Sequence, residues 1–285
     1  MRYEAPASVG EAVALLDADE GAKVIAGGTD LLVQYRSGLR EPTAFVDVKR
    51  IPDLMEISID ADGLVLGAAT PAAEVFENTE IRQLWPGVAE ATDLIGSTQI
   101  QGRATLGGNL CNSSPAADTV PALIAVGAQA VIAGPSGERE LAVEDFVTGP
   151  GQNVLGRGEF LVKLRVPRPG PRTSDAYLRL IPRTEMDIAV VGAGVALTLD
   201  EGGTCTAARV AIGAVAPTAL LVPDAAAALV GSSVDDAALA GAAQAASAAA
   251  SPIDDKRGTV AYRRKVTGVL TQRAAAIAAE RARER

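Results

Sequence analysis

Residues 167–171, which read PRPGP, constrain the fold of this chain more than any other segment. Proline lacks a main-chain N–H and fixes φ, so such a segment cannot continue a helix or an interior strand of a sheet. The 285 residues also reach the length, about 250–300 residues, at which one hydrophobic core usually gives way to two domains. We therefore predict a domain boundary here, with one domain over residues 1–170 and a second over residues 171–285.

Composition and charge exclude several classes of protein. Hydrophobic residues make up 48% of the chain and charged residues 21%, which is typical of a folded globular protein. A net charge of -9 opposes binding to a phosphate backbone, so nucleic acid is not an expected partner. The longest apolar stretches, residues 121–133 and 188–199, are shorter than the roughly 20 residues of a membrane-spanning helix. Residues 1–13 lack the pattern of a secretory signal, and we expect a cytoplasmic protein.

Two absences narrow the possible chemistry. The chain contains no histidine, which excludes a catalytic imidazole, a histidine metal ligand and a histidyl link to a flavin. Its two cysteines, Cys111 and Cys205, cannot supply the four thiolates of an iron–sulfur cluster. We therefore expect no metal site in this chain, and any such centre must lie on a partner.

The first domain is predicted to begin with a small α/β lobe over residues 1–55. Ser8 and Glu11 form a capping box that opens a first helix. The β-branched run at 22–26 predicts a strand that ends at a glycine pair, after which a helix begins near Leu31. A second lobe, residues 56–170, follows. Its expected elements are a hairpin at 56–67, helices at 71–76 and 81–95, an apolar helix or strand at 120–133, and a strand at 159–166.

The second domain is predicted to combine an antiparallel sheet with helices. The expected strands cover residues 176–180, 188–199 and 207–214, and the expected helices 219–230, 235–250 and 259 to the end of the chain. In the last helix the apolar spacing predicts a buried stripe of Tyr262, Val266, Val269 and Leu270, with Arg263, Arg264 and Arg273 lying off it.

One glycine motif is misleading. Residues 190–194, VVGAG, resemble the start of a dinucleotide-binding fingerprint, but Leu197 stands where the third glycine belongs and the segment continues as a strand. The chain also has no GxxxxGK[ST] phosphate loop. The sequence therefore argues against a classical Rossmann site and against a nucleoside-triphosphate site.

Two other glycine pairs predict an anion-binding site. In residues 25–31, IAGGTDL, the glycines lie between a strand and a helix, where exposed main-chain N–H groups and the Thr29 hydroxyl can donate to phosphate oxygens. Residues 105–109, TLGGN, repeat this chemistry. Either segment alone is also compatible with an ordinary tight turn, whereas together they are suited to clamp one dinucleotide from two sides.

Three segments resemble a known family in order and spacing. They are AGGTDLL at 26–32, ATLGGNLCNSSPAAD at 104–118 and YLRLIPRTEMDIAVVGAG at 177–194. Together they are similar to the FAD-binding medium subunit of molybdenum hydroxylases, a family that includes the flavoprotein subunit of aerobic carbon monoxide dehydrogenase and the flavin domain of xanthine dehydrogenase. The resemblance extends over essentially the whole chain.

The resemblance implies an α+β fold. A two-lobed FAD-binding domain of the vanillyl-alcohol oxidase/p-cresol methylhydroxylase type, with lobes at about 1–55 and 56–170, would precede a C-terminal domain with a sheet at 176–214 and helices at 219–285.

The resemblance also implies which residues bind FAD. The first loop would lie along the phosphates and the second would approach the same cofactor; their residues are Val24, Ile25, Ala26, Gly27, Gly28, Thr29, Asp30, Leu31, Thr105, Leu106, Gly107, Gly108 and Asn109. Asp118 would accept hydrogen bonds from ribose or ribitol hydroxyls, and Val162 would belong to an apolar wall. Arg179 falls where relatives often carry a lysine near the flavin; an exposed charge on a strand is the alternative for this residue.

Further residues near these motifs have weaker interpretations. The family binds FAD without a covalent bond, so a cysteinyl link at Cys111 is not expected. Arg183, Glu185 and Asp187 are expected to form a local ion network.

By the same resemblance the chain is an electron-transfer subunit with no catalytic side chain of its own. A small subunit with [2Fe-2S] clusters would deliver electrons, a large subunit with the molybdenum cofactor would oxidise the substrate, and an external acceptor would reoxidise the flavin. We expect a hetero-oligomer, as a dimer of heterotrimers, in which hydrophobic and arginine-bearing C-terminal surfaces contact the partner subunits. The alternatives are a self-sufficient FAD-dependent oxidoreductase of the vanillyl-alcohol oxidase type and a scaffold that has lost its flavin. The sequence leaves the substrate and the acceptor open.

Overall fold

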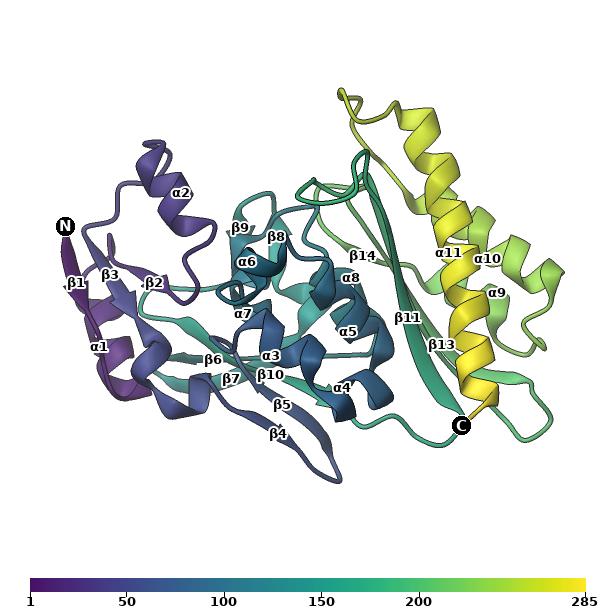
Figure 1. Ribbon diagram of the computed structural model, residues 1–285, viewed down its shortest axis with the longest axis horizontal. Helices are drawn as coiled ribbons and strands as arrows, with labels where there is room; N and C mark the ends of the chain where they lie inside the picture. Colours follow the sequence, from purple (N-terminus) through teal and green to yellow (C-terminus); the bar gives the residue numbers. More distant parts are fainter.

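Three β-sheets, each beside its own hydrophobic core, follow one another along the molecule (Figure 1), and a fourth sheet has only two strands. The computed structural model describes all residues from Met1 to Arg285. The strands are β1 Arg2–Glu4, β2 Lys23–Ile25, β3 Ala44–Asp47, β4 Ile57–Ile59, β5 Gly63–Gly67, β6 Gln129–Gly134, β7 Gly137–Ala142, β8 Val147–Gly149, β9 Gln152–Asn153, β10 Phe160–Pro167, β11 Thr173–Leu180, β12 Val191–Leu199, β13 Cys205–Gly213 and β14 Leu220–Leu221. The helices are α1 Val9–Ala18, α2 Leu31–Arg36, α3 Ala72–Glu77, α4 Thr79–Leu84, α5 Pro86–Asp93, α6 Thr98–Gln101, α7 Leu106–Asn112, α8 Thr119–Ala125, α9 Pro223–Leu229, α10 Asp236–Ala249 and α11 Val260–Arg283.

The N-terminal part contains a parallel three-stranded sheet of order β1-β3-β2. The predicted capping box is present at the start of α1, where Ser8 Oγ accepts from the Glu11 N–H at 3.2 Å. The Glu11 carboxylate accepts from the N–H of Ala7, one residue before the N-cap, at 2.8 Å. The core of this part packs on one face of the next sheet, through residues that include Val131 and Val162.

The middle part is an antiparallel five-stranded sheet of order β4-β5-β10-β6-β7. The predicted hairpin at 56–67 is confirmed as β4 and β5. Residues on the other face of this sheet, such as Leu66 and Ile132, share a core with helices α3 to α8. In Figure 1 these helices lie between the five-stranded sheet and the C-terminal sheet.

The C-terminal part is an antiparallel four-stranded sheet, β11-β12-β13-β14, with α9 and α11 packed against it and α10 packed on these two helices. Helix α8 of the middle part contacts β12 and β13 as well. The predicted sheet and the helices α10 and α11 are confirmed, and so is the mixed helix-and-sheet class. None of the helices has the combination of length and hydropathy that a bilayer crossing needs.

Three predicted elements differ from the structure. The helix expected at 81–95 is divided at Trp85 into α4 and α5, because Pro86 begins a new helix. The apolar run at 120–133 contains both a helix and a strand, α8 and β6, separated at Gly127, whose φ of 72° suits glycine. Residues 219–230 are not helical throughout: β14 pairs with β13 through Leu221, and α9 begins only at Pro223.

The predicted buried stripe of α11 is wrong at two positions. Tyr262 is 46% exposed. Arg263 is 4% exposed, because its guanidinium donates to Val190 O at 2.8 Å and forms an ion pair with Asp255 at 2.7 Å. The buried face of α11 consists largely of small residues, among them Gly268 and Ala275. Small side chains give little apolar contrast between the two faces, so the spacing of the large residues was a poor guide.

Charged groups join the middle and C-terminal parts. Asp175 of β11 accepts from the Val88 N–H of α5 at 3.2 Å, and Arg281 of α11 pairs with Glu90 of α5. Burial raises the pKa of the Asp175 carboxyl to about 7, and the Glu90 carboxylate acts in the same direction, against the cations Arg285 and Arg281. Asp175 therefore binds its proton more tightly in the folded protein than in the unfolded chain.

This difference predicts a pH-dependent loss of stability. Ionisation of Asp175 should lower the free energy of unfolding as the pH rises from about 4 to above 7, by roughly 2–4 kcal/mol. Asp175→Asn removes the charge but keeps an oxygen that can accept from Val88. In urea unfolding we expect the variant to be more stable than the wild type at both pH 5 and pH 8, by a clearly larger margin at pH 8. An equal difference at both pH values would show that Asp175 does not titrate in this range.

Candidate functional site

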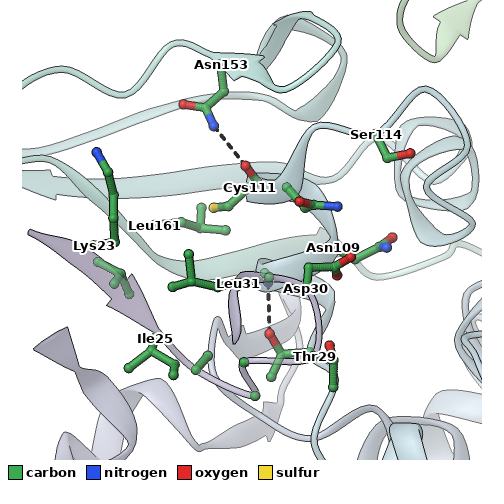
Figure 2. Close-up of a pocket in the computed structure, with 18 of the residues that line it drawn as sticks. Lys23, Ile25, Thr29, Asp30, Leu31, Asn109, Cys111, Ser114, Asn153 and Leu161 are labelled. Atoms are coloured by element: carbon green, nitrogen blue, oxygen red, sulfur yellow. Dashed lines mark hydrogen bonds between the residues drawn. The ribbon is translucent and has the colours of Figure 1, made fainter. Parts of the chain in front are cut away.

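A cleft of about 960 Å³ lies where the three parts meet. Its walls come from the loop between β2 and α2, from α7 and the residue before it, from the β8–β9 ribbon, and from the loop between β11 and β12. The volume is at the upper end of the range of about 300–1,000 Å³ for small-molecule sites, which suits an extended ligand. Figure 2 shows Thr29 of the first glycine loop and Asn109 and Cys111 of α7 around this cavity.

The first glycine loop follows β2 directly, and both glycines are required by its geometry. A Cβ at Gly27 would lie 1.7 Å from the carbonyl oxygen of Arg103, so the loop touches the main chain just before the second loop. Gly28 has a φ of 74°, a conformation that disfavours other residues. The two glycine segments, far apart in the sequence, are thus held together by main-chain contact.

The first loop presents a row of unpaired main-chain donors. None of the N–H groups of residues 27–31 donates a hydrogen bond within the chain, although the next one, of Leu32, is bonded to Gly28 O at 3.1 Å. All five of these residues line the cleft. Successive free N–H groups at a strand-to-helix turn form a cradle for an anion.

The second glycine loop, residues 105–109, forms the start of α7 and exposes main chain without a side chain to the cleft at Gly108. Thr105 is the N-cap, and its hydroxyl accepts from the Gly108 N–H at 2.8 Å. A Cβ at Gly107 would lie 2.4 Å from Ala68 O, so this glycine allows the helix to pack. Gly108 is different: a Cβ there would meet only Thr105 Oγ1, at 2.9 Å, and would otherwise project into open space in the cleft.

Asp118 lines the cleft and links it to the C-terminal part. Its carboxylate accepts from the Tyr177 hydroxyl at 3.2 Å and from Arg179 at 2.7 Å. Burial raises the pKa of Asp118 to about 6, and the Arg179 guanidinium acts in the opposite direction. The Arg179 side chain is 5% exposed and also donates to Leu94 O at 2.8 Å, so the alternative of an exposed strand charge is wrong.

Most of the predicted site residues line this one cleft. They are Val24, Ile25, Ala26, Gly27, Gly28, Thr29, Asp30, Leu31, Thr105, Gly107, Gly108, Asn109 and Asp118. The other three do not. Leu106 and Val162 are buried in the cores, and Arg179 lies behind Asp118. In β10 it is Leu161, the neighbour of Val162, that reaches the cleft.

Other lining residues were not identified from the sequence. Gln34 donates to Asn112 at 2.9 Å and so joins α2 to α7, while Asn153 of β9 donates to Cys111 O at 3.0 Å (Figure 2). The cationic side chains of Lys23, Arg40 and Arg157 also line the cleft. Lys23 directly precedes the first glycine loop, whereas Arg40 and Arg157 lie outside both loops and only the fold brings them to the cleft.

Met186, Asp187 and Ile188, from the loop between β11 and β12, form another wall of the cleft. The ion network expected here is present in part. Asp187 pairs with Arg183 at 3.1 Å and with Arg257 at 3.5 Å, whereas Glu185 forms no ion pair.

Cys111 is half-buried beside the cleft as a free thiol. Burial raises its pKa to about 12, so the thiol stays protonated near neutral pH. A protonated thiol is a poor nucleophile, which argues against a covalent bond from Cys111 to a ligand. The chain contains no group of three or more acidic or cysteine side chains placed to hold a metal ion.

Two family models of known proteins match the N-terminal and the C-terminal parts of the chain. Residues 1–169 match the family model described as the FAD binding domain in molybdopterin dehydrogenase, and residues 176–278 match the CO dehydrogenase flavoprotein C-terminal domain. The chain is 35% identical over 273 residues to the carbon monoxide dehydrogenase medium chain of Hydrogenophaga pseudoflava, covering 95% of this chain and 94% of that one. It is 32% identical over 218 residues to the xanthine dehydrogenase FAD-binding subunit of Escherichia coli O157:H7, covering 76% and 74%.

Solved structures agree with this placement. A structure of carbon monoxide dehydrogenase from Hydrogenophaga pseudoflava superposes with a TM-score of 0.94 at 36% identity, over 99% of this chain and 98% of that one. Quinoline 2-oxidoreductase from Pseudomonas putida 86 superposes with a TM-score of 0.91 at 31% identity, over the same shares.

The glycine geometry predicts unequal effects of the same small change. Gly27→Ala places a Cβ on the Arg103 carbonyl, and we expect it to lower the free energy of unfolding by more than about 2 kcal/mol, because main chain must move. Gly108→Ala gains about 1 kcal/mol of helix propensity and weakens the Thr105 cap by a similar amount, so little net change is expected. Urea unfolding of both variants measures the difference; equal destabilisation would contradict the contact between the loops.

Proposed function

Because this chain belongs to the family of FAD-binding subunits of molybdenum hydroxylases, we propose that it binds one FAD in the cleft and transfers electrons from [2Fe-2S] clusters of a small subunit to an external acceptor. The observation that carries the proposal is the row of free main-chain N–H groups at residues 27–31, on the same cleft as the bare surface of Gly108. These groups suit a pyrophosphate, which needs several donors and close approach to the main chain.

The donors, cationic side chains and carboxylate that line the cleft suit the phosphate and hydroxyl groups of FAD. The donors of the first loop and of the start of α7 would hold the pyrophosphate from two sides. Lys23, Arg40 and Arg157 add positive charge to a cleft within an otherwise acidic chain. Asp118 would accept from a ribose or ribitol hydroxyl, since each carboxylate oxygen can accept a second hydrogen bond.

Three residues of the predicted site would act indirectly. Arg179 orients Asp118 through their 2.7 Å ion pair, while Leu106 and Val162 support α7 and β10 from the core side. The cleft also borders Ile95, Ile100 and Leu161, which supply an apolar wall suited to an aromatic ring system.

FAD, when bound, accepts and releases electrons singly or in pairs. The residues of the chain bind and orient it and limit its contact with water. No histidine is available to move a proton, and the Cys111 thiol is not ionised, so no side chain is assigned a catalytic step. This division of tasks favours an electron-transfer subunit over a self-sufficient oxidoreductase of the vanillyl-alcohol oxidase type, which would need an acid or base beside its substrate.

The partners and the architecture follow from family membership. We propose a large subunit with the molybdenum cofactor and a small subunit with the iron–sulfur clusters, assembled with this chain as a dimer of heterotrimers, with C-terminal surfaces in contact with the partners. The two free cysteines are consistent with a reducing compartment, which supports the cytoplasm. The PRPGP linker and the two matched ranges support the proposed domains at 1–170 and 171–285. We further propose that the first domain has the two lobes of the vanillyl-alcohol oxidase type.

The cofactor content of the purified chain tests the proposed function. We expect a flavin spectrum, about one FAD released by acid per chain, no iron–sulfur absorption, and an unmodified protein mass after denaturation. A chain that is colourless and also fails to bind added FAD would favour a scaffold. Oxidation of a substrate by the isolated chain would favour the self-sufficient enzyme instead.

Gly108→Val tests the second loop. The added side chain projects into the cleft where the phosphates are proposed to lie, so FAD binding should be lost, with an affinity at least about 100-fold lower. Gly102→Val is the matched control, because Gly102 lies before the same loop, is exposed, and has no heavy atom within 4 Å of its added Cβ. Fluorescence titration of both apoproteins with FAD gives the affinities. Normal binding by a folded Gly108→Val variant would show that this loop does not contact the cofactor.

A further inference from the structure

The parallel pairing of β2 and β3 brings the ends of two strands together beneath the first glycine loop. Ile25, the last residue of β2, is paired with Asp47, the last residue of β3. The carboxyl ends of parallel strands lie at the same edge of a sheet. The residues that follow β3 therefore lie within reach of the loop that follows β2.

Lys49 occupies this position and contacts the loop. Its Nζ donates to Ala26 O at 2.8 Å and to Asp47 Oδ1 at 2.7 Å. Asp47 is held in turn by the Tyr3 hydroxyl, which donates to Oδ2 at 2.5 Å, and it accepts from the Lys49 N–H at 3.1 Å. The ammonium group is thus fixed between a carboxylate and a carbonyl of the loop. Lys49 itself does not line the cleft.

The contact with Ala26 fixes the direction of the next N–H. The chain has no cis peptide bond, and in a planar trans peptide the C=O and the N–H point in opposite directions. The carbonyl of Ala26 points at Lys49, so the N–H of Gly27, in the same peptide unit, points away from Lys49. Gly27 lines the cleft and its N–H has no acceptor within the chain.

We propose that Lys49 is a positioning residue for pyrophosphate recognition: it holds the Ala26–Gly27 peptide so that the Gly27 N–H faces the phosphates of the cofactor. The inference rests on the proposed function, because it assigns a pyrophosphate to this loop. The ammonium also polarises the Ala26 carbonyl, which strengthens the Gly27 N–H as a donor. Lys49 acts through the main chain and makes no contact with the ligand.

The assignment predicts a loss of affinity confined to ligands that carry a pyrophosphate. Lys49→Met keeps the length of the side chain and removes the donor. We expect the affinity of the apoprotein for FAD and for ADP to fall roughly tenfold, and that for riboflavin, which has no phosphate, to stay unchanged. Isothermal or fluorescence titration of the full-length chain with the three ligands measures this.

Arg50→Met is the matched control. Arg50 is the next residue along the chain, and its exposed side chain forms no hydrogen bond or ion pair. Loss of its charge tests for a merely electrostatic effect, so wild-type affinity for ADP is expected. If Lys49→Met does not fold, Lys49→Leu, which also lacks a donor, replaces it with the same expectations.

Two results would overturn the assignment. One is an unchanged affinity for ADP in the Lys49 variant; the other is an equal loss for riboflavin, which would indicate a general structural role. A wild-type chain that binds neither FAD nor ADP would instead refute the proposed function, so the two failures are distinguishable.

Discussion

The close contact between Gly27 and the Arg103 carbonyl is the constraint on which the cleft depends. It joins the loop after β2 to the segment before α7, and any side chain at residue 27 would force them apart, because a Cβ would lie 1.7 Å from that oxygen. The loop is supported from the other side by Lys49, which follows β3 in the same parallel sheet. Main chain on one side and an ammonium group on the other therefore hold the free N–H groups of residues 27–31 in place.

The C-terminal part completes the site without supplying its donors. Arg179 and Tyr177 of β11 hold Asp118 at the cleft, and Met186, Asp187 and Ile188 form a wall. These side chains are themselves tied down, because β11 is joined to α5 and α11 by the charged contacts around Glu90. A shift of this part relative to the middle part would move the wall and pull Arg179 and Tyr177 away from Asp118, so the shape of the cleft depends on the junction as well as on the loops.

Local patterns predicted much of the fold and the centre of the site. The capping box at Ser8, the hairpin at 56–67 and the strand–glycine–helix order of the first loop are encoded by residues close in sequence. Burial of Arg263 was not predictable in this way, because it depends on the carbonyls of Val190 and Ala214 from other strands. Lys49 and Asn153 were missed for the same reason: each acts on a main-chain atom of a distant segment, and their own neighbours carry no motif.

A site built mainly from main-chain donors can tolerate substitution of most of the side chains around it. Its chemistry depends on the absence of Cβ atoms at a few positions and on the path of the backbone, whereas most side chains around it supply only packing. Solved structures with 31–36% identity to this chain superpose with TM-scores of 0.91–0.94, so the backbone path persists although about two thirds of the residues differ. Side chains that hold the backbone, such as Lys49, are replaceable in principle by other donors at the same place. Recognition of the cofactor can then remain while its supports differ from one relative to another.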